Sequence, residues 1–203
     1  MCFLATQTTH QAEPLVSIIT VHYNQPELTA MLLCSLRKIT YSPVEVWVVD
    51  NGSEASRSVD PLIEQFPEVH FLKSAFNRGF AGGNNLAIQR ASGAYLLFLN
   101  NDVEVAPSFL EPLVGRLQAD SSIGMVSPKI KYFETPDRLQ YAGSSEINTL
   151  TGQGHFVGHG QPDAPAFNRS EPTAYVHGAA MMVSRRLVEV IGDMDEDFFL
   201  YYE

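Results

Sequence analysis

One short run of large apolar residues does most to limit the folds open to this chain. Residues 95–99 are all Tyr, Leu or Phe, and Asn100, Asn101 and Asp102 follow at once. The run is too short to cross a membrane and carries no charged position, which is typical of a strand buried on both faces of a parallel sheet. In open α/β sheets, ligands bind just beyond the carboxyl ends of the strands. We therefore expect Asp102 to lie at a ligand-binding edge.

A second run follows the same pattern. Residues 44–49 are mainly Val and Trp, and they end at Asp50. Two aspartates at adjacent strand ends of one α/β domain indicate a site for a nucleotide and a metal ion, because Mg²⁺ and Mn²⁺ prefer oxygen ligands. Each aspartate has a structural alternative. Asp50 can form an Asx turn over residues 50–52, and Asp102 can cap a helix that begins at Pro107.

Strands and helices are expected to alternate between residues 16 and 127. Asn24 is expected to cap the first helix, and the pair Gly82 and Gly83 to open the third. This alternation predicts an α/β fold with a mainly parallel, Rossmann-like sheet and helices on both faces. The expected strands are residues 16–21, 44–50, 69–72, 95–100 and 123–126, and the expected helices are residues 26–39, 56–66, 82–92 and 107–119.

The pattern changes after residue 127. Residues 131–175 are rich in Gly, Pro, Asn, Asp and His and show weak periodicity, so we expect irregular loops. Within them, residues 143–170 are expected to be mobile without ligand and to border the acceptor. A strand at residues 175–183 and a short helix capped by Ser184 and running through Ile191 are expected to follow. The chain stops inside an aromatic run at residues 197–203, which we interpret as a cut rather than a natural terminus.

The net charge of −10 and the pI near 5.0 argue against a nucleic-acid partner, because phosphate backbones need basic surfaces. No apolar run approaches the roughly 20 residues that span a bilayer. Residues 1–15, expected to be disordered or extended, lack the features of a signal peptide. Cys2 and Cys34 do not suggest a disulfide framework. These features together predict a cytoplasmic protein.

A third segment of interest spans residues 77–85, with the sequence NRGFAGGNN. Glycines let a ligand approach the backbone closely, and a helix N-terminus attracts phosphate. The guanidinium of Arg78 adds a permanent positive charge with N–H donors in a fixed planar arrangement. Together with strand-end acids on the same sheet edge, this segment predicts binding of a nucleoside diphosphate.

The order of these segments resembles that of the family 2 glycosyltransferases, and in particular the bacterial rhamnosyltransferase-like enzymes. The resemblance rests on residues 22–24, 49–53, 77–85, 99–102, 178–179 and 195–203. It implies a GT-A fold and a catalytic domain over residues 16–203. Residues 16–127 would form the nucleotide-binding half and residues 128–203 the acceptor half, truncated at its C-terminus.

The resemblance also implies a reaction, namely inverting transfer of a sugar from a nucleotide-diphosphate donor, either dTDP-rhamnose-like or a UDP-sugar. The acceptor would be a hydroxyl of a growing cell-surface glycan or glycolipid. A lipid-linked acceptor would bring the protein to the inner face of the membrane as a peripheral protein.

The resemblance implies roles for residues on the donor side. Tyr23 and Asp50 would hold the base and ribose, Asn101 would lie near the ribose, and Asp102 would bind Mg²⁺ or Mn²⁺ at the diphosphate. Asn77, Arg78 and Gly79 complete the nucleotide-binding set. Where the family usually has an acid at the first position of its metal motif, this chain has Asn100.

On the acceptor side, the resemblance implies that the site includes His177, Gly178 and Asp197. In this family the second acid of a pair after the aromatic run takes the proton from the acceptor. Glu203 matches only the first acid, so the expected base is the next residue and Glu203 is the candidate within the chain. We therefore expect this chain to bind donor but to transfer sugar poorly. For His177, the alternative is a packed strand histidine.

Two other functions fit parts of the pattern. A sugar nucleotidyltransferase is also α/β and metal-dependent, but such enzymes place a basic, glycine-rich loop after the first strand, where this chain has residues 22–26, HYNQP. A nucleotide-binding fragment without turnover is the non-enzymatic alternative.

Overall fold

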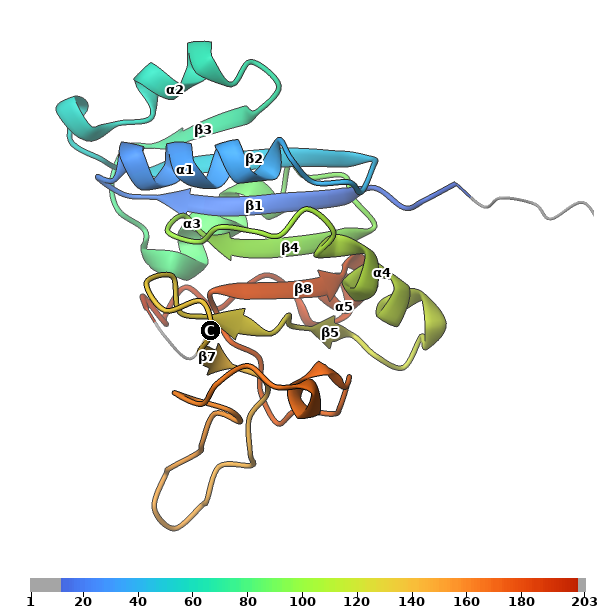
Figure 1. The fold of residues 1–203 in the computed structure, drawn as a ribbon. Helices are drawn as coiled ribbons and strands as arrows, with labels where there is room; N and C mark the ends of the chain where they lie inside the picture. The colour runs from blue at the N-terminus through green and yellow to red at the C-terminus, as the bar shows by residue number, and fades with distance from the viewer. Residues whose placement is uncertain (1–11, 201–203) are drawn as a thin grey trace, which may run out of the picture.

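The computed structural model of the protein describes residues 12–200, and within them the main element is a six-stranded sheet (Figure 1). The strand order is β3-β2-β1-β4-β8-β5. Strands β3, β2, β1 and β4 are parallel, whereas β8 is antiparallel to both β4 and β5. The mainly parallel sheet is thus confirmed. The strands are β1 (Val16–His22), β2 (Val44–Asn51), β3 (His70–Ser74), β4 (Tyr95–Asn100), β5 (Met125–Val126) and β8 (Ala180–Ser184).

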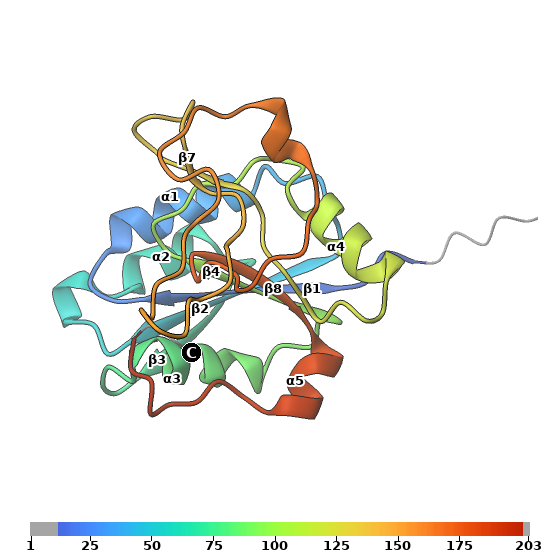
Figure 2. The same cartoon turned by 90° about the horizontal axis from the view of Figure 1, so that it is seen from below.

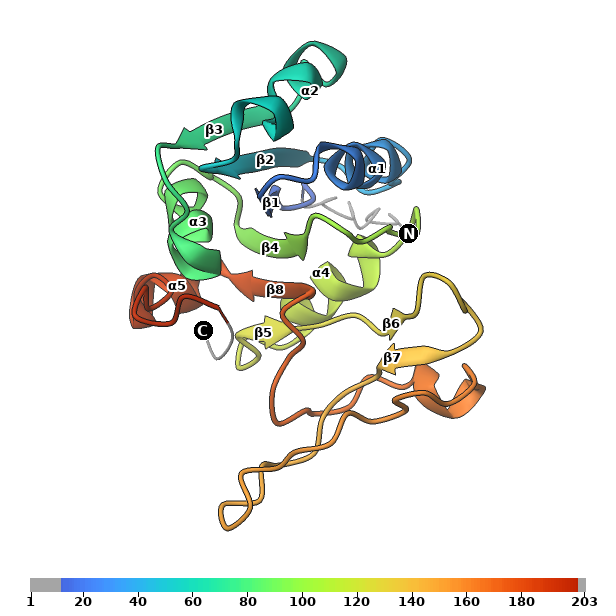
Figure 3. The same ribbon diagram turned by 90° about the vertical axis from the view of Figure 1, so that its left-hand side faces the viewer.

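Helices cover both faces of this sheet. Helices α1 (Pro26–Leu36) and α4 (Leu110–Ala119) lie on one face, and α3 (Gly79–Ile88) and α5 (Arg185–Ile191) lie on the other (Figure 3). Successive strand residues divide between the two cores: Leu97 joins the cluster beneath α1 and α4, whereas Phe98 joins the cluster beneath α3. Both are almost fully buried. The prediction that residues 95–99 form a strand buried on both faces is confirmed.

The first two helices differ from expectation at their ends. Asn24 does not cap α1: its backbone is left-handed, with φ 57°, and its side chain accepts the backbone N–H of Glu54 at 2.9 Å. The N-cap position is Gln25, which makes no side-chain cap bond. The second expected helix is divided into a 3₁₀ turn, η1 (Ala55–Arg57), and α2 (Asp60–Gln65), because a proline in the first turn of α2 begins a new helix there.

Helix α3 begins at Gly79, so Gly82 and Gly83 lie inside it and do not open it. A Cβ atom on Gly83 would lie 2.9 Å from the side chain of Val21 on β1. The glycine therefore lets the helix approach the sheet closely, a tertiary requirement that the local sequence does not reveal.

Residues 130–175 are more regular than expected. Strands β6 (Ile130–Lys131) and β7 (Leu139–Tyr141) pair with each other. Beyond β7 the chain forms an arm over residues 142–157 that projects from the body (Figure 3). Its backbone pairs along its length, with hydrogen bonds from Ala142 to Val157 at 3.0 Å and from Asn148 to Gln153 at 2.9 Å. A 3₁₀ turn, η2 (Pro165–Asn168), follows. Backbone hydrogen bonds between its two sides hold such an arm together. Its sequence therefore does not need the alternation of apolar and polar residues that marks a half-buried strand.

The second half of the chain returns to the main sheet. Strand β8 lies between β4 and β5 (Figure 3). Ser184 caps α5 by accepting the N–H of Leu187 at 3.2 Å, as predicted. The sheet therefore draws strands from both sides of the boundary at residue 127. Among residues 12–200, no helix has the length and apolar character to cross a membrane.

Candidate active site

The predicted site residues gather at the carboxyl edge of the sheet, where β1, β2 and β4 end (Figure 3). Tyr23 follows β1, Asp50 lies near the end of β2, and Asn101 and Asp102 follow β4. Strand β1 pairs with both β2 and β4 and so lies between them. The expectation that Asp50 and Asp102 lie on adjacent strand ends is therefore wrong, since a whole strand separates them.

Asp50 is built into the fold at this edge. It is only 3% exposed, and its carboxylate accepts the backbone N–H groups of Ser53 at 3.0 Å and Val59 at 3.1 Å. The Asx-type contact considered as its structural alternative is thus present. A carboxylate has about four lone-pair sites, so two N–H donors do not exhaust its capacity to accept. Its contact with a nucleotide stays a prediction.

Asn51 is a residue that sequence reasoning missed. Its side-chain nitrogen donates to Asn77 Oδ1 at 3.0 Å and to the carbonyl of Gly79 at 2.9 Å, and its oxygen accepts the N–H of Arg78 at 3.0 Å. One buried amide therefore fixes residues 77–79 to the end of β2. An Asn-Gly pair directly after a buried strand was the available signal.

Arg78 is paired within the chain. Its Nη1 atom lies 3.8 Å from Glu196 Oε2, and its guanidinium carbon lies 5.1 Å from the centre of the Phe76 ring. Both charged side chains are partly exposed, so the ion pair is weak and Arg78 can exchange partners at little cost. A contact between Arg78 and a diphosphate stays a prediction.

The N-terminus of α3 is closed by groups of the protein itself. The N–H of Gly79 donates to Asn77 Oδ1 at 2.9 Å, and the N–H of Phe80 donates to the carbonyl of Phe199 at 2.8 Å. Gly79 has φ 73°, the left-handed region that favours glycine. A phosphate at Gly79 remains a prediction, and it requires the contact with Phe199 to open.

Asn101 is oriented by a buried polar network. Its side-chain nitrogen donates to Thr29 Oγ1 at 3.2 Å, and Thr29 lies 2.8 Å from His22 Nδ1. The other ring nitrogen of His22 faces the carbonyl of Arg57 at 2.9 Å. A carbonyl only accepts, so Nε2 donates to the carbonyl of Arg57. Asn101 is thereby held beyond the end of β4, at the same edge of the sheet as Tyr23, which follows β1 and is 46% exposed.

Asp102 is the exposed carboxylate of this edge. It lines a cavity of about 170 Å³, whose other lining residues are Leu28, Met31, Val103, Glu104, Phe133 and Glu134. Within residues 12–200, no group of three or more His, Cys, Asp or Glu residues is placed to hold a metal ion. The donors present suit a hard ion that takes one protein carboxylate and completes its shell with substrate phosphates, which is how Mg²⁺ usually binds.

Two of the acceptor-side residues, His177 and Gly178, lie just before β8, and Asp197 lies after α5. His177 packs against Tyr141 and Phe156, with ring centres 5.5 and 5.2 Å away, and its Nδ1 accepts the N–H of Ala179 at 3.1 Å. Burial lowers the pKa of His177. It is therefore a packed, neutral histidine, although one that is only partly buried.

Gly178 is exposed, and no atom lies within 4 Å of the position that its Cβ would occupy. Asp197 is also exposed, and its N–H donates to Asp195 Oδ1 at 3.0 Å. Glu203, the candidate base, lies outside the described residues.

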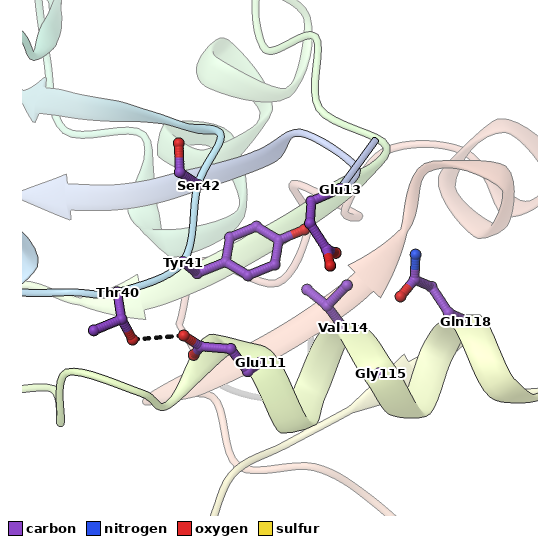
Figure 4. Close-up of a pocket in the computed structure, with 8 residues that line it drawn as sticks. All are labelled: Glu13, Thr40, Tyr41, Ser42, Glu111, Val114, Gly115 and Gln118. Carbon is purple, nitrogen blue, oxygen red and sulfur yellow. Dashed lines mark hydrogen bonds between the residues drawn. The ribbon is translucent and has the colours of Figure 1, made fainter. Parts of the chain in front are cut away.

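A separate cavity of about 310 Å³ lies at the opposite, amino edge of the sheet (Figure 4). It is lined by residues that precede β1 and β2 and by one side of α4: Glu13, Thr40, Tyr41, Ser42, Glu111, Val114, Gly115 and Gln118. The hydroxyl of Thr40 donates to Glu111 at 2.5 Å across it. None of the predicted site residues lines this cavity.

Comparison with known proteins agrees with this arrangement. The model of "Glycosyl transferase family 2" matches residues 17–192. The O-antigen biosynthesis protein RfbC of Myxococcus xanthus is 34% identical over 91% of this chain, which covers 15% of RfbC. The N-acetylglucosaminyl-diphospho-decaprenol L-rhamnosyltransferase of Mycobacterium tuberculosis is 23% identical over 93% of this chain and 67% of its own length.

Among solved structures, the mannosyltransferase PcManGT from Pyrobaculum calidifontis, in complex with GDP-Man and Mn²⁺, is similar to this chain with a TM-score of 0.64 and 22% identity. The match covers 91% of this chain and 48% of PcManGT. This likeness concerns the fold. The chain thus spans about half of PcManGT and a small part of RfbC.

Proposed function

The chain belongs to glycosyl transferase family 2, and on that premise we propose that it transfers a sugar from a nucleotide-diphosphate donor to a hydroxyl of a growing cell-surface glycan or glycolipid. The observation that carries the proposal is the carboxyl edge of the sheet, where Asp102 is exposed two residues beyond the end of a strand buried on both faces. The similarity to RfbC, an O-antigen biosynthesis protein, and to the mycobacterial N-acetylglucosaminyl-diphospho-decaprenol L-rhamnosyltransferase supports a glycan or lipid-linked acceptor.

The donor nucleotide would bind across the ends of β1, β2 and β4. Tyr23 offers an exposed ring for the base, and Asp50 offers buried acceptor oxygens for a base N–H or a ribose hydroxyl. Asn101, oriented through Thr29, would lie near the ribose. Asn77, Arg78 and Gly79 would meet the diphosphate. A thymidine or uridine diphosphate fits this donor set, with dTDP-rhamnose or a UDP-sugar as the donor.

Asp102 would hold Mg²⁺ or Mn²⁺ at the diphosphate, with the phosphate oxygens as further ligands. A divalent ion bound there spreads the negative charge that builds on the leaving diphosphate. The solved complex of PcManGT with Mn²⁺ supports the choice of ion. Arg78 would add a second positive charge when it leaves Glu196 for the phosphates.

The acceptor would enter from the side formed by residues 128–203. A carboxylate there takes the proton of the acceptor hydroxyl while the oxygen attacks the anomeric carbon from the face opposite the leaving group, which inverts the configuration. Asp197 is the predicted acceptor-side acid among the described residues, and Glu203 is the candidate outside them. His177, whose pKa burial lowers, would stay neutral and shape the pocket.

The proposal is tested by incubating the protein with dTDP-rhamnose, UDP-sugars and GDP-mannose, with Mn²⁺ or Mg²⁺ and glycan acceptors, and measuring the released nucleoside diphosphate. We expect slow release that depends on both acceptor and divalent ion, and NMR of the product should show an inverted anomeric centre. Release of pyrophosphate from a nucleoside triphosphate would support a nucleotidyltransferase instead. Nucleotide binding without any release would support a binding module.

A further inference from the structure

The glycine-rich segment at residues 77–85 lies beside residues 194–199, although more than a hundred positions separate them (Figures 2 and 3). The centre of the contact is Asn85, which is 5% exposed. Its oxygen accepts the N–H of Met194 at 3.0 Å, and its nitrogen donates to the carbonyl of Met194 at 2.9 Å and to Glu196 Oε1 at 3.1 Å.

The chemistry of the contact requires an amide. To bond both the N–H and the carbonyl of one residue, a side chain must accept and donate at the same end. The amide of Asn can do both, as the backbone of a neighbouring strand does in a sheet. A carboxylate only accepts, and an apolar side chain does neither. Asn85 therefore holds the backbone of Met194 as well as a side chain.

The glycines of α3 make room for the same segment. A Cβ atom on Gly79 would lie 2.2 Å from the carbonyl oxygen of Phe199, and a Cβ on Gly82 would lie 3.1 Å from Glu196 Oε2. The Phe80 N–H bonds to that carbonyl of Phe199, and Arg78 faces Glu196. The side of α3 that lacks side chains is thus the surface on which residues 194–199 lie.

We propose that Asn85 is a positioning residue that fixes residues 194–199 against α3, so that the acids of this segment, Asp197 among them, are presented to the acceptor. The glycine-rich segment then has two tasks: its start meets the donor diphosphate, and its helix holds the acceptor-side segment. This inference rests on the proposed function, because it assigns the held segment to the acceptor.

The test compares Asn85→Ala with Asn84→Ala. Asn84 is a matched control: it is the neighbouring residue of the same helix, it is 1% exposed, and its side-chain nitrogen donates to the carbonyl of Phe80 within the helix. Misplacement of a reacting group by about 1 Å can cost about 10²-fold in rate. We expect Asn85→Ala to lower kcat by about that factor without weakening UDP binding, and Asn84→Ala to lower kcat far less.

A charge exchange sharpens the test. Asn85→Asp places a carboxylate beside Glu196 and removes both donated bonds, so it should lower kcat at least as far as Asn85→Ala. Adding Glu196→Gln to Asn85→Asp restores a hydrogen-bond donor between residues 85 and 196. The double variant should therefore recover part of the lost kcat. Equal kcat for Asn85→Ala and Asn84→Ala, or loss of UDP binding together with kcat in Asn85→Ala, would overturn the positioning role.

Hydrogen exchange separates this inference from the proposed function. The amides of Met194 and Phe80 should lose protection in Asn85→Ala and keep it in Asn84→Ala, whatever the activity of the protein. Unchanged protection in Asn85→Ala would overturn the placement. Absence of sugar transfer by the wild-type protein with every donor would instead overturn the proposed function.

Discussion

The carboxylate of Asp50 accepts the backbone N–H of Val59 at 3.1 Å and so ties the end of β2 to the start of α2. The second oxygen of the same carboxylate accepts the N–H of Ser53 at 3.0 Å. A side chain proposed to contact the nucleotide therefore also supports the loop that surrounds it. Substitutions at Asp50 must be measured for stability and for binding separately.

Asp50→Ala should lower the free energy of unfolding by about 2 kcal/mol or more, because it leaves two backbone N–H groups without an acceptor and each buried one costs about 1–3 kcal/mol. It should also weaken nucleotide binding with or without Mn²⁺. Urea unfolding and calorimetry measure the two effects, with Asp193→Ala, a change at an exposed aspartate, as the control. A variant as stable as the wild type would contradict the structural role.

Arg78→Ala should weaken UDP binding about tenfold, since hydrogen bonds to charged groups contribute about 1.5–3 kcal/mol when well formed and this arginine is partly exposed. Glu196→Gln removes the partner carboxylate but keeps the guanidinium, so it should not weaken UDP binding. Titration calorimetry of both variants distinguishes the effect of losing the positive charge from the effect of losing the ion pair. Equal losses in both would mean that the ion pair, not the positive charge, matters.

Much of the fold follows from the sequence because its signals are local. The apolar runs that end at Asp50 and Asp102 predicted buried parallel strands, and the Ser184 cap was readable from residue type and position. The expectations that were wrong concern residues whose roles depend on contacts with segments distant in sequence. Gly83 looked like a helix start but serves the packing of α3 on Val21, and Asn24 bonds to Glu54 instead of capping α1.

The strand ends that carry the candidate residues could be predicted from the sequence, but the connections between those strands could not. The strand-end pattern indicated Asp50 and Asp102, and the family resemblance added Tyr23 and Asn101. Neither showed that β1 separates the two acids. The strand order follows from how helices pack, which periodicity does not encode. The role of Asn51 in holding residues 77–79 was likewise hidden, because its bonds cross 26 or more positions.

The arm at residues 142–157 should exchange its amide hydrogens faster than the strands of the main sheet, and fastest at its tip. Leu150 there is 95% exposed, and backbone bonds between the arm's own two sides hold its outer part, whereas Ser144 at its base also bonds to Thr173 and Tyr175. Hydrogen exchange with and without donor and acceptor measures this, and we expect protection to rise when acceptor binds. Protection in the free protein equal to that of β1 would contradict the prediction.

His177 should make the protein less stable as the pH falls. Burial lowers its pKa below the ordinary value of 6.5, so the unfolded chain takes up a proton that the folded chain resists. Stability should therefore decline as the pH drops below 6.5 and level off below the lowered pKa of the folded state. Protonation of Nδ1 would also break its bond with the Ala179 N–H.

Unfolding in urea between about pH 8 and about pH 5 measures this dependence, because His is the side chain that ordinarily titrates there. In His177→Gln the decline should be smaller than in the wild type. His155→Gln is the control, since His155 is exposed. An identical decline in wild type and His177→Gln would contradict the assignment.

Calorimetric titration of UDP and dTDP into wild type and Asp102→Ala, each with and without Mn²⁺, tests the central claim most directly. We expect Mn²⁺ to tighten nucleotide binding to the wild type and to have little effect on Asp102→Ala, because Asp102 is the exposed carboxylate at the carboxyl edge of β4. Binding of equal strength to both proteins, with and without Mn²⁺, would contradict a metal-assisted diphosphate site at this edge.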